Sequence, residues 1–462
     1  MSAPALIFDL TAILAIGSLM LRRRPWASLA LAAVGSLLIG IFALRAPIEI
    51  PHELLGVSLE FEGGWRILGR LIALSDRNRA PVAFLYLTGA LFFAAGIFAR
   101  PGRTFAPVGL LTLGLLGGSL TIEPFLYAAI FLELAAMAAI LVLNPPETGS
   151  DPGSLQLLVL YTLAMIAILF TGWLLDNVGI TSVTPELASK VMSLLALGFA
   201  ILMFIPPFHF WLGRAAETAN PYSLAFLAVV LQSAGLFFLL RFLDSLEWLR
   251  SEPRVFGAGL TVGLLMAGLG SLASAAQTNY SKMIAYALVA DFGVTLFAIG
   301  SSLAGALQIV LFHLGIRVVS LAVWGLGATA LRRIRGDAQL IGAGRANPLA
   351  ACASLIGALG LAGFPVTGGF PIRWALLREP TGSTNVGATI VLASMVLVSI
   401  SVGRWATRIF SPARDGEERS VAGTNRWIFL AGILVCLLLG AFPQLGLPWV
   451  GPALRGFANL QP

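Results

Sequence analysis

The sequence predicts an all-α polytopic membrane protein with about fourteen transmembrane helices. Of its 462 residues, 58% are hydrophobic and only 11% are charged, whereas soluble domains carry about 25% charged residues. Apolar runs of about 17–25 residues, the length that crosses a bilayer, recur along the chain. Two of these runs are interrupted by proline and glycine, which is typical of transport proteins with discontinuous helices.

The first apolar run covers residues 5–21 and is followed by Arg22, Arg23 and Arg24. A cleaved signal peptide has its charges before the apolar run and small residues at a cleavage site after it. The order here is reversed, so we expect a retained first helix whose N-terminus lies on the outer side.

The remaining spans are predicted from the same length criterion. They cover residues 27–45, 82–99, 105–121, 123–143, 156–175, 191–213, 222–243, 255–274, 283–301, 304–331, 348–376, 386–409 and 426–446. Residues 46–80 mix charges with aliphatic residues and are predicted to form a short amphipathic element or a strand pair at the membrane interface.

The seventh run breaks at Pro206 and Pro207, and the twelfth breaks around Gly363 and Pro365. The two breaks are offset by five helices. Because this number is odd, equivalent helices cross the membrane in opposite directions. We therefore predict two inverted five-helix repeats with discontinuous helices 7 and 12. The expected parts are helices 1–3 with the interfacial segment 46–80 (1–104), a first half (105–243), a second half (244–410) and a C-terminal helix with its tail (411–462).

Most arginines between the spans fall in the odd-numbered loops, whereas the even-numbered loops are mixed or acidic. This bias places the odd loops in the cytoplasm and both termini outside. Four arginines lie in the opposite set: Arg66, Arg70, Arg77 and Arg79. The net charge of +7 therefore reflects membrane topology and not nucleic-acid binding.

The sequence contains none of the usual cofactor motifs, since CxxC, HExxH, GxGxxG and P-loop patterns are all missing. Cys352 and Cys436 both lie inside apolar runs, where a cysteine behaves as a small hydrophobic residue. We expect no metal site and no disulfide framework.

Ionisable residues at membrane depth are costly and are therefore candidates for function. Glu133 lies in the middle of its span without a cation within one helical turn, so it is either a reversible proton carrier or a neutral carboxyl that holds two helices together. His209 follows the first break and either lies on a proton path or holds carbonyl groups that the prolines leave free.

His313 and Arg317 are four residues apart and share one helix face. Arginine does not give up its proton, so Arg317 holds charge without relaying it. Asp291 is a chemically suitable partner, and we expect a buried, neutral Asp291–Arg317 pair.

The remaining candidates lie near helix ends. Lys282 either takes part in transport or extends to the interface. Glu217 and Arg214 flank a helix junction, where they are expected to pair. Arg373 either faces a cavity or caps the end of a half-helix.

Several motifs together resemble the antiporter-like subunits of respiratory complex I, Mrp-type antiporters and membrane-bound hydrogenases. They are PFHFWL at 207–212 followed by Glu217 and an NPYS turn, SKMIAYALVADFG at 281–293, HLGIR at 313–317 and GFPVTGGFPIRW at 363–374. Glu133 falls where the fifth helix of that family carries its Glu. The resemblance covers about residues 105–410.

In the family, a Glu on helix five and lysines on helices seven, eight and twelve form a proton relay. The resemblance places Leu202 and Gln232 at the lysine positions of helices seven and eight, and Arg317 and Arg373 at those of helices eleven and twelve. Neither Leu nor Gln titrates. The resemblance therefore implies a relay that is interrupted in the first half and fixed in the second.

The resemblance implies a membrane-arm subunit of a complex I-like, redox-driven proton or cation translocase in the inner membrane. Other membrane-arm subunits and lipid would be its partners, and quinone and redox centres would lie in partner subunits. Two alternatives stay open: a pump-inactive structural subunit, and a component of an Mrp-type antiporter or an inorganic-carbon transporter.

Overall fold

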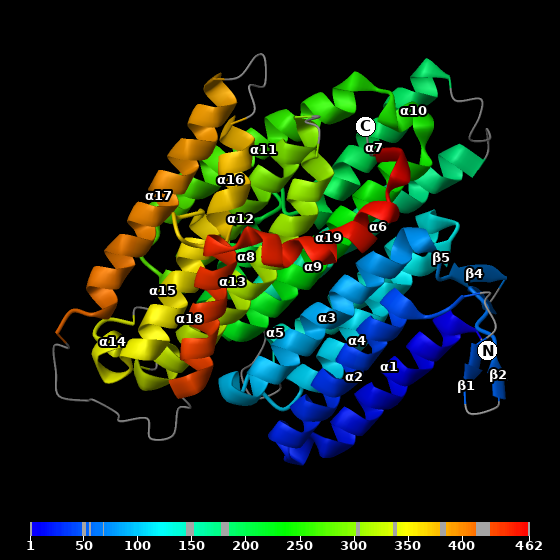
Figure 1. The fold of residues 1–462 in the computed structure, drawn as a ribbon. Coiled ribbons are helices and arrows are strands. Elements are labelled where there is room, and N and C mark those ends of the chain that lie inside the picture. Colours follow the sequence, from blue (N-terminus) through cyan, green and yellow to red (C-terminus); the bar gives the residue numbers. More distant parts are fainter. Residues whose placement is uncertain are drawn as a thin grey trace.

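The computed structural model is a bundle of helices whose two ends carry short connecting elements (Figure 1). It describes residues 2–48, 52–54, 57–67, 69–144, 152–176, 184–301, 305–335, 340–378, 385–412 and 426–460.

The N-terminal helices begin and end close to the predicted limits. They are α1 (Ala3–Met20), α2 (Pro25–Arg45), α3 (Asp76–Ala99), α4 (Phe105–Thr121), α5 (Ala128–Leu143) and α6 (Pro152–Asp176). The single turn η1 (Leu21–Arg23) joins α1 to α2, and η2 (Phe125–Tyr127) precedes α5. Proline in the first turn of α2 suits a helix start, because that position needs no backbone donor.

The segment after α2 forms strands, one of the two structures expected for residues 46–80. β1 (His52–Leu54) pairs with β2 (Val57–Leu59), and β3 (Gly64–Ile67) pairs with β4 (Arg70–Ala73), both antiparallel. A further strand that was not predicted, β5 (Ile122–Glu123), pairs with β4 through Leu71 and Glu123. It attaches the strands to the end of α4.

Two helices are interrupted where the sequence predicts. α7 (Pro185–Leu202) ends before the Pro206–Pro207 pair, and α8 (Phe210–Thr218) begins after it. Likewise α15 (Pro348–Ala362) ends before Gly363, and α16 (Gly369–Arg378) follows.

The other helices complete the bundle. They are α9 (Pro221–Ser245), α10 (Glu247–Arg250), α11 (Pro253–Ala276), α12 (Tyr280–Gly300), α13 (Ala306–Arg335), α14 (Ala343–Ala346), α17 (Asn385–Ile409), α18 (Arg426–Ala441) and α19 (Leu447–Arg455). The turns η3 (Pro443–Gly446) and η4 (Ala458–Leu460) flank α19.

The core of the molecule is made by α9, α12 and α13, whose residues are nearly all buried. The outer helices α1, α6, α11 and α17 expose large apolar side chains instead, among them Ile13, Trp173, Leu265 and Ile400. A helix that is apolar on its exposed face is suited to lipid, which covers that face without cost.

Ten of the described helices are long and apolar enough to cross a membrane, and four shorter apolar helices accompany them: α4, α5, α15 and α18. The chain is therefore a polytopic helical membrane protein. The fourteen spans and the inverted repeats stay predictions.

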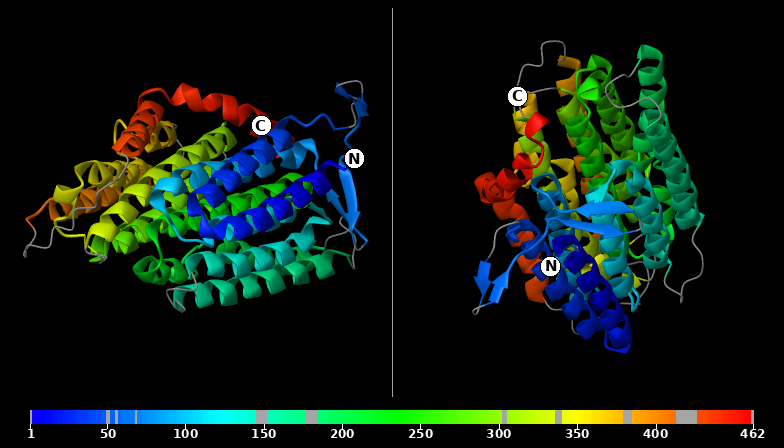
Figure 2. Two further views of the ribbon diagram at one scale, coloured as in Figure 1. Left: turned by 90° about the horizontal axis from the view of Figure 1, so that it is seen from below. Right: turned by 90° about the vertical axis from the view of Figure 1, so that its right-hand side faces the viewer.

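The last apolar helix is shorter than expected, because α18 ends at Ala441 and not at residue 446. Pro443 stops the helix. Figures 1 and 2 show that the chain then turns, and α19 lies across the outside of the bundle, where it contacts α3 and α13. Both chain ends lie at the same end of the bundle: Ser2 pairs with Glu62 beside the strands, and Asn459 bonds to Asp244 at the end of α9.

Candidate functional site: a polar chain between two helix breaks

At the first break, the carbonyl groups that α7 leaves free lie against α9. The side chain of Gln232, which is fully buried on α9, donates from Nε2 to the Met203 carbonyl at 3.2 Å. A freed carbonyl in lipid would cost several kcal/mol, so this hydrogen bond stabilises the interruption.

At the second break, an arginine has the equivalent role. Arg373 on α16 donates from Nη2 to the Leu361 carbonyl at 2.6 Å and from Nη1 to the Gly369 carbonyl at 3.1 Å. Gly363, with φ of +73°, lets the chain turn there, and a Cβ at this position would lie 2.2 Å from Cδ of Arg373. One of the two roles expected for Arg373, capping the end of a half-helix, is therefore observed.

Asp291 on α12 lies between the two breaks and contacts three basic side chains. Its Oδ1 is 2.7 Å from Nη2 of Arg373 and 3.1 Å from Nε2 of His313, and its Oδ2 is 3.0 Å from Nε of Arg317. Only the contact with Arg373 has hydrogen-bond alignment; the contacts with His313 and Arg317 are within ion-pair distance but lack it. All four side chains are at most 3% exposed.

Arg317 connects this cluster to the first break, because its Nη2 donates to Oε1 of Gln232. We name the sequence Gln232–Arg317–Asp291–Arg373, with the carbonyls of Met203 and Leu361 at its ends, the central polar chain. It joins α7, α9, α13, α12, α16 and α15 through buried polar contacts.

The central polar chain carries more positive than negative charge. Two guanidinium groups face one carboxylate, so with His313 neutral the net charge is +1. Nη1 of Arg317 and Nδ1 of His313 have no hydrogen-bond partner among the described residues. The Arg317 guanidinium lies 5.0 Å from the centre of the Phe292 ring, a cation–π contact that offsets part of its desolvation.

The expected buried Asp291–Arg317 contact is present, but the carboxylate is shared with a second arginine, which the sequence did not indicate. Arg373, which is 82 residues from Asp291 in the sequence, shares the same carboxylate. Chemistry suggested the first partner, whereas the second depends on how the interrupted α16 packs.

Glu133 on α5 lies apart from the central polar chain. Its Oε1 accepts a hydrogen bond of 2.6 Å from Thr162 on α6, and its Oε2 is buried without a partner among the described residues. The hydroxyl of the neighbouring Tyr161 is also buried and unpartnered within these ranges. Neither Thr162 nor Tyr161 was predicted, since nothing in the sequence places α6 beside Glu133.

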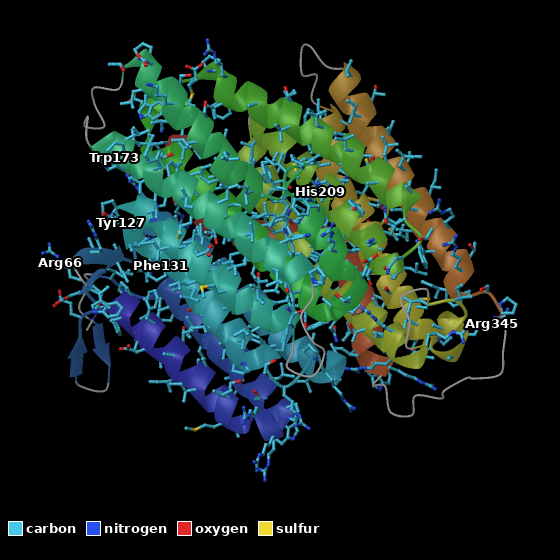
Figure 3. All side chains as sticks on the ribbon, turned by 180° about the vertical axis from the view of Figure 1, so that it is seen from behind. Arg66, Tyr127, Phe131, Trp173, His209 and Arg345 are labelled. Carbon is cyan, nitrogen blue, oxygen red and sulfur yellow. The ribbon has the colours of Figure 1, made fainter. Side chains whose placement is uncertain are left out.

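His209 lies in the middle of the molecule, at the start of α8 (Figure 3). Its ring packs edge-on against Tyr286 of α12 at 5.6 Å, and its Nδ1 is buried without a partner in the part of the chain that is described. Gln232, and not His209, bonds the carbonyl freed at this break.

Lys282 pairs with Glu217 across α12 and α8, and both side chains are partly exposed. The expected Glu217–Arg214 pair is therefore wrong. Because Lys282 lies in the first turn of α12, this contact ties the two helices near the bundle end and lies outside the central polar chain.

Leu202, at the lysine position of the seventh helix, is 1% exposed and packs against Gly235. Leucine has no titratable group, so this position does not carry a proton. No group of three or more potential metal ligands occurs among the described residues.

Two interrupted helices joined by buried ionic groups define a membrane transport protein of the discontinuous-helix class. A family model described as "NADH:quinone oxidoreductase/Mrp antiporter, TM" matches residues 158–401, more than half of the chain. The chain belongs to this family.

One relative is similar in sequence, and chains of two solved structures share the fold. The NADH-quinone oxidoreductase subunit N of Cereibacter sphaeroides is 27% identical over 90% of this chain and 98% of its own length. A chain of the membrane-bound sulfane sulfur reductase, an archaeal respiratory membrane complex, shares the fold with a TM-score of 0.81 at 17% identity (99% and 98% covered). A chain of respiratory complex I from Thermus thermophilus gives 0.76 at 21% identity (98% and 100% covered).

Proposed function

We propose that the chain is a membrane-arm subunit of a complex I-like, redox-driven translocating complex and that its own proton relay is impaired. The central polar chain is the observation that carries this proposal. It connects the two helix breaks mainly through an amide and two guanidinium groups, which do not exchange protons near neutral pH.

The titratable groups within the spans support the same view. Asp291 contacts two arginines, which stabilise its charged form. His313 lies beside this charged cluster. Glu133 accepts a hydrogen bond from Thr162, and the buried Leu202 at the end of α7 has no titratable group. In this proposal the subunit transmits a conformational or electrostatic change between the breaks while neighbouring subunits carry the protons.

We also propose how the chain is placed in the complex and in the membrane. Other membrane-arm subunits contact this chain, quinone and redox centres lie in those partners, and the chain spans the inner membrane with both termini outside. The halves 105–243 and 244–410 are inverted repeats that meet at the central polar chain.

The first test is proton pumping by the assembled complex in sealed vesicles, with the intact chain compared with Glu133→Gln. This substitution removes the only titratable carboxyl on α5 and keeps a group that accepts from Thr162. We expect unchanged assembly and an unchanged number of protons per electron. A lower ratio with normal assembly would show that the first half conducts through Glu133, and the impaired relay would be rejected.

A further inference from the structure

The four arginines that oppose the charge bias of the loops lie at the strand-bearing end of the bundle. Two of them have structural partners. Arg70 stacks over the ring of Tyr127 at 4.0 Å, and Arg79 pairs with Asp76 at 3.4 Å and donates to the Ala43 carbonyl at 3.1 Å. Arg66 and Arg77 make no ion pair with any described residue and are exposed. Ion pairing within the described residues therefore does not account for these two arginines.

Arg66 and Arg77 line one polar pocket of about 620 Å³. The walls come from the strands, the first turn of α3 and the end of α9, which contributes Arg241. Figure 3 shows Arg66 at the edge of the molecule, on the side of Tyr127.

The register of the sheet explains why the side chains of Arg66 and Glu123 face the same pocket. Arg66 lies opposite Leu71, and Leu71 lies opposite Glu123, so these three residues form one row across β3, β4 and β5. Side chains in one such row point to the same face of a sheet. Glu123 in turn lies 3.6 Å from Arg241.

The pocket has a surplus of positive charge. It holds three arginines and one glutamate, a net charge of +2. Arg241 is largely buried and is fixed by hydrogen bonds to the Leu120 and Ile122 carbonyls at 2.9 and 3.1 Å. The positive end of the α3 dipole adds to the same potential.

The pocket lies at the ends of the spanning helices, and this position indicates which ligand it could bind. α3 begins, and α4 and α9 end, at this level, and the ends of spanning helices lie among lipid headgroups. Trp65 and Tyr127 lie nearby, as expected of the aromatic belt at a membrane interface. Arginine pairs with phosphate oxygens through two parallel hydrogen bonds.

We propose that Arg66, Arg77 and Arg241 form a binding site for a phosphate group, supplied by the headgroup of an anionic phospholipid. The site does not depend on proton transport, and it accounts for Arg66 and Arg77, two of the four arginines that oppose the charge bias of the loops.

The test is a lipid titration of the full-length chain in detergent, followed by native mass spectrometry. Phosphatidylglycerol is compared with phosphatidylcholine for the intact chain, for Arg66→Gln/Arg77→Gln and for Arg22→Gln/Arg23→Gln. The last variant removes the same charge from exposed arginines of η1, outside the residues that line the pocket.

We expect phosphatidylglycerol to bind the intact chain and the Arg22/Arg23 control alike, and the Arg66/Arg77 variant at least about tenfold more weakly. Competition by inorganic phosphate would show that the phosphate group alone is recognised, whereas its failure to compete would show that the whole lipid is. Equal phosphatidylglycerol binding by all three proteins would overturn the proposal. A second result would also overturn it. If the Arg66/Arg77 variant bound lipid normally but its complexes lost a neighbouring subunit, the pocket would bind a protein partner and not a lipid.

Discussion

At the scale of single residues, the carboxylate of Asp291 compensates part of the charge of two buried arginines. One carboxylate faces Arg317 and Arg373, and all three side chains are at most 3% exposed. Removing one partner of a buried ion pair typically costs about 3–5 kcal/mol, because a charge is left uncompensated. Because the cluster has a surplus of positive charge, removing the carboxylate is expected to cost more stability than removing one arginine.

We therefore expect Asp291→Asn to lower the free energy of unfolding by about 3–5 kcal/mol, since it leaves two unpaired cations. Arg317→Gln is expected to cost much less, because Asp291 keeps Arg373 and the cluster becomes neutral. Thermal unfolding of the purified chain in detergent would compare them. An Arg317→Gln variant as unstable as Asp291→Asn would show that the two arginines are not in surplus and that another acidic group balances the second one.

The Asp291–Arg317 contact shows how far chemistry alone predicts a site. A buried acid and a buried base in separate spans were expected to meet, and they do. The sequence did not indicate that Arg373 shares the carboxylate or that Gln232 bonds Arg317, because both contacts depend on the packing of distant spans. The Lys282–Glu217 pair was missed for the same reason.

At the scale of elements, the position of Asp291 depends on the close packing of α11 against α12. A Cβ on Gly293 would lie 2.6 Å from the backbone nitrogen of Ala267, and one on Gly263 would lie 2.4 Å from that of Phe297. Small residues allow helix backbones in membranes to approach closely. Gly293 is two residues from Asp291, so this close approach of the two backbones lies beside the acidic residue of the central polar chain.

Gly293→Ala is expected to destabilise the chain by about 1–3 kcal/mol, because the new methyl group meets backbone that cannot move aside. Gly257→Ala on α11 is the matched control: its Cβ would meet nothing within 4 Å, and alanine favours a helix by about 1 kcal/mol. Denaturation midpoints of both variants would check this. Equal denaturation midpoints for the two variants would mean that α11 and α12 can move apart to accommodate the added methyl group.

The elements themselves were largely predictable. Apolar length located most spans to within a few residues, and proline and glycine located both breaks, because these effects are local. The end of α18 was misplaced, since residues 443–446 form the turn η3 that leads into α19 and do not extend the span. The strand β5 was missed because a two-residue strand has no sequence pattern.

At the scale of the whole molecule, the C-terminal segment closes the bundle from outside. α19 packs on α3 and α13, and Phe457 stacks on Phe237 of α9 with ring centres 6.4 Å apart. Asp244, buried at the end of α9, accepts from the Asn459 backbone at 3.0 Å, and its carbonyl accepts from the Asn459 side chain at 3.1 Å. The Asp244 carboxylate and carbonyl thus hold the segment together with the apolar packing of α19 and Phe457.

Asp244→Ala is expected to release this segment, because the change removes the acceptor of a charge-assisted hydrogen bond worth about 1.5–3 kcal/mol. Limited proteolysis would then cut after α18 faster than in the intact chain. Asp244→Asn keeps an acceptor and should lie between the two. Identical cleavage of Asp244→Ala and the intact chain would show that apolar packing alone holds α19.

The net charge of the central polar chain also determines what could pass through the bundle. A cation that came within 4 Å of a fixed +1 charge would be repelled by about 4 kcal/mol at an effective dielectric constant of 20. Such a barrier slows passage by roughly a thousandfold at room temperature. With His313 neutral, the arrangement that satisfies the two helix breaks would therefore oppose the passage of sodium, potassium and hydronium alike past Arg317 and Arg373, which share a single carboxylate.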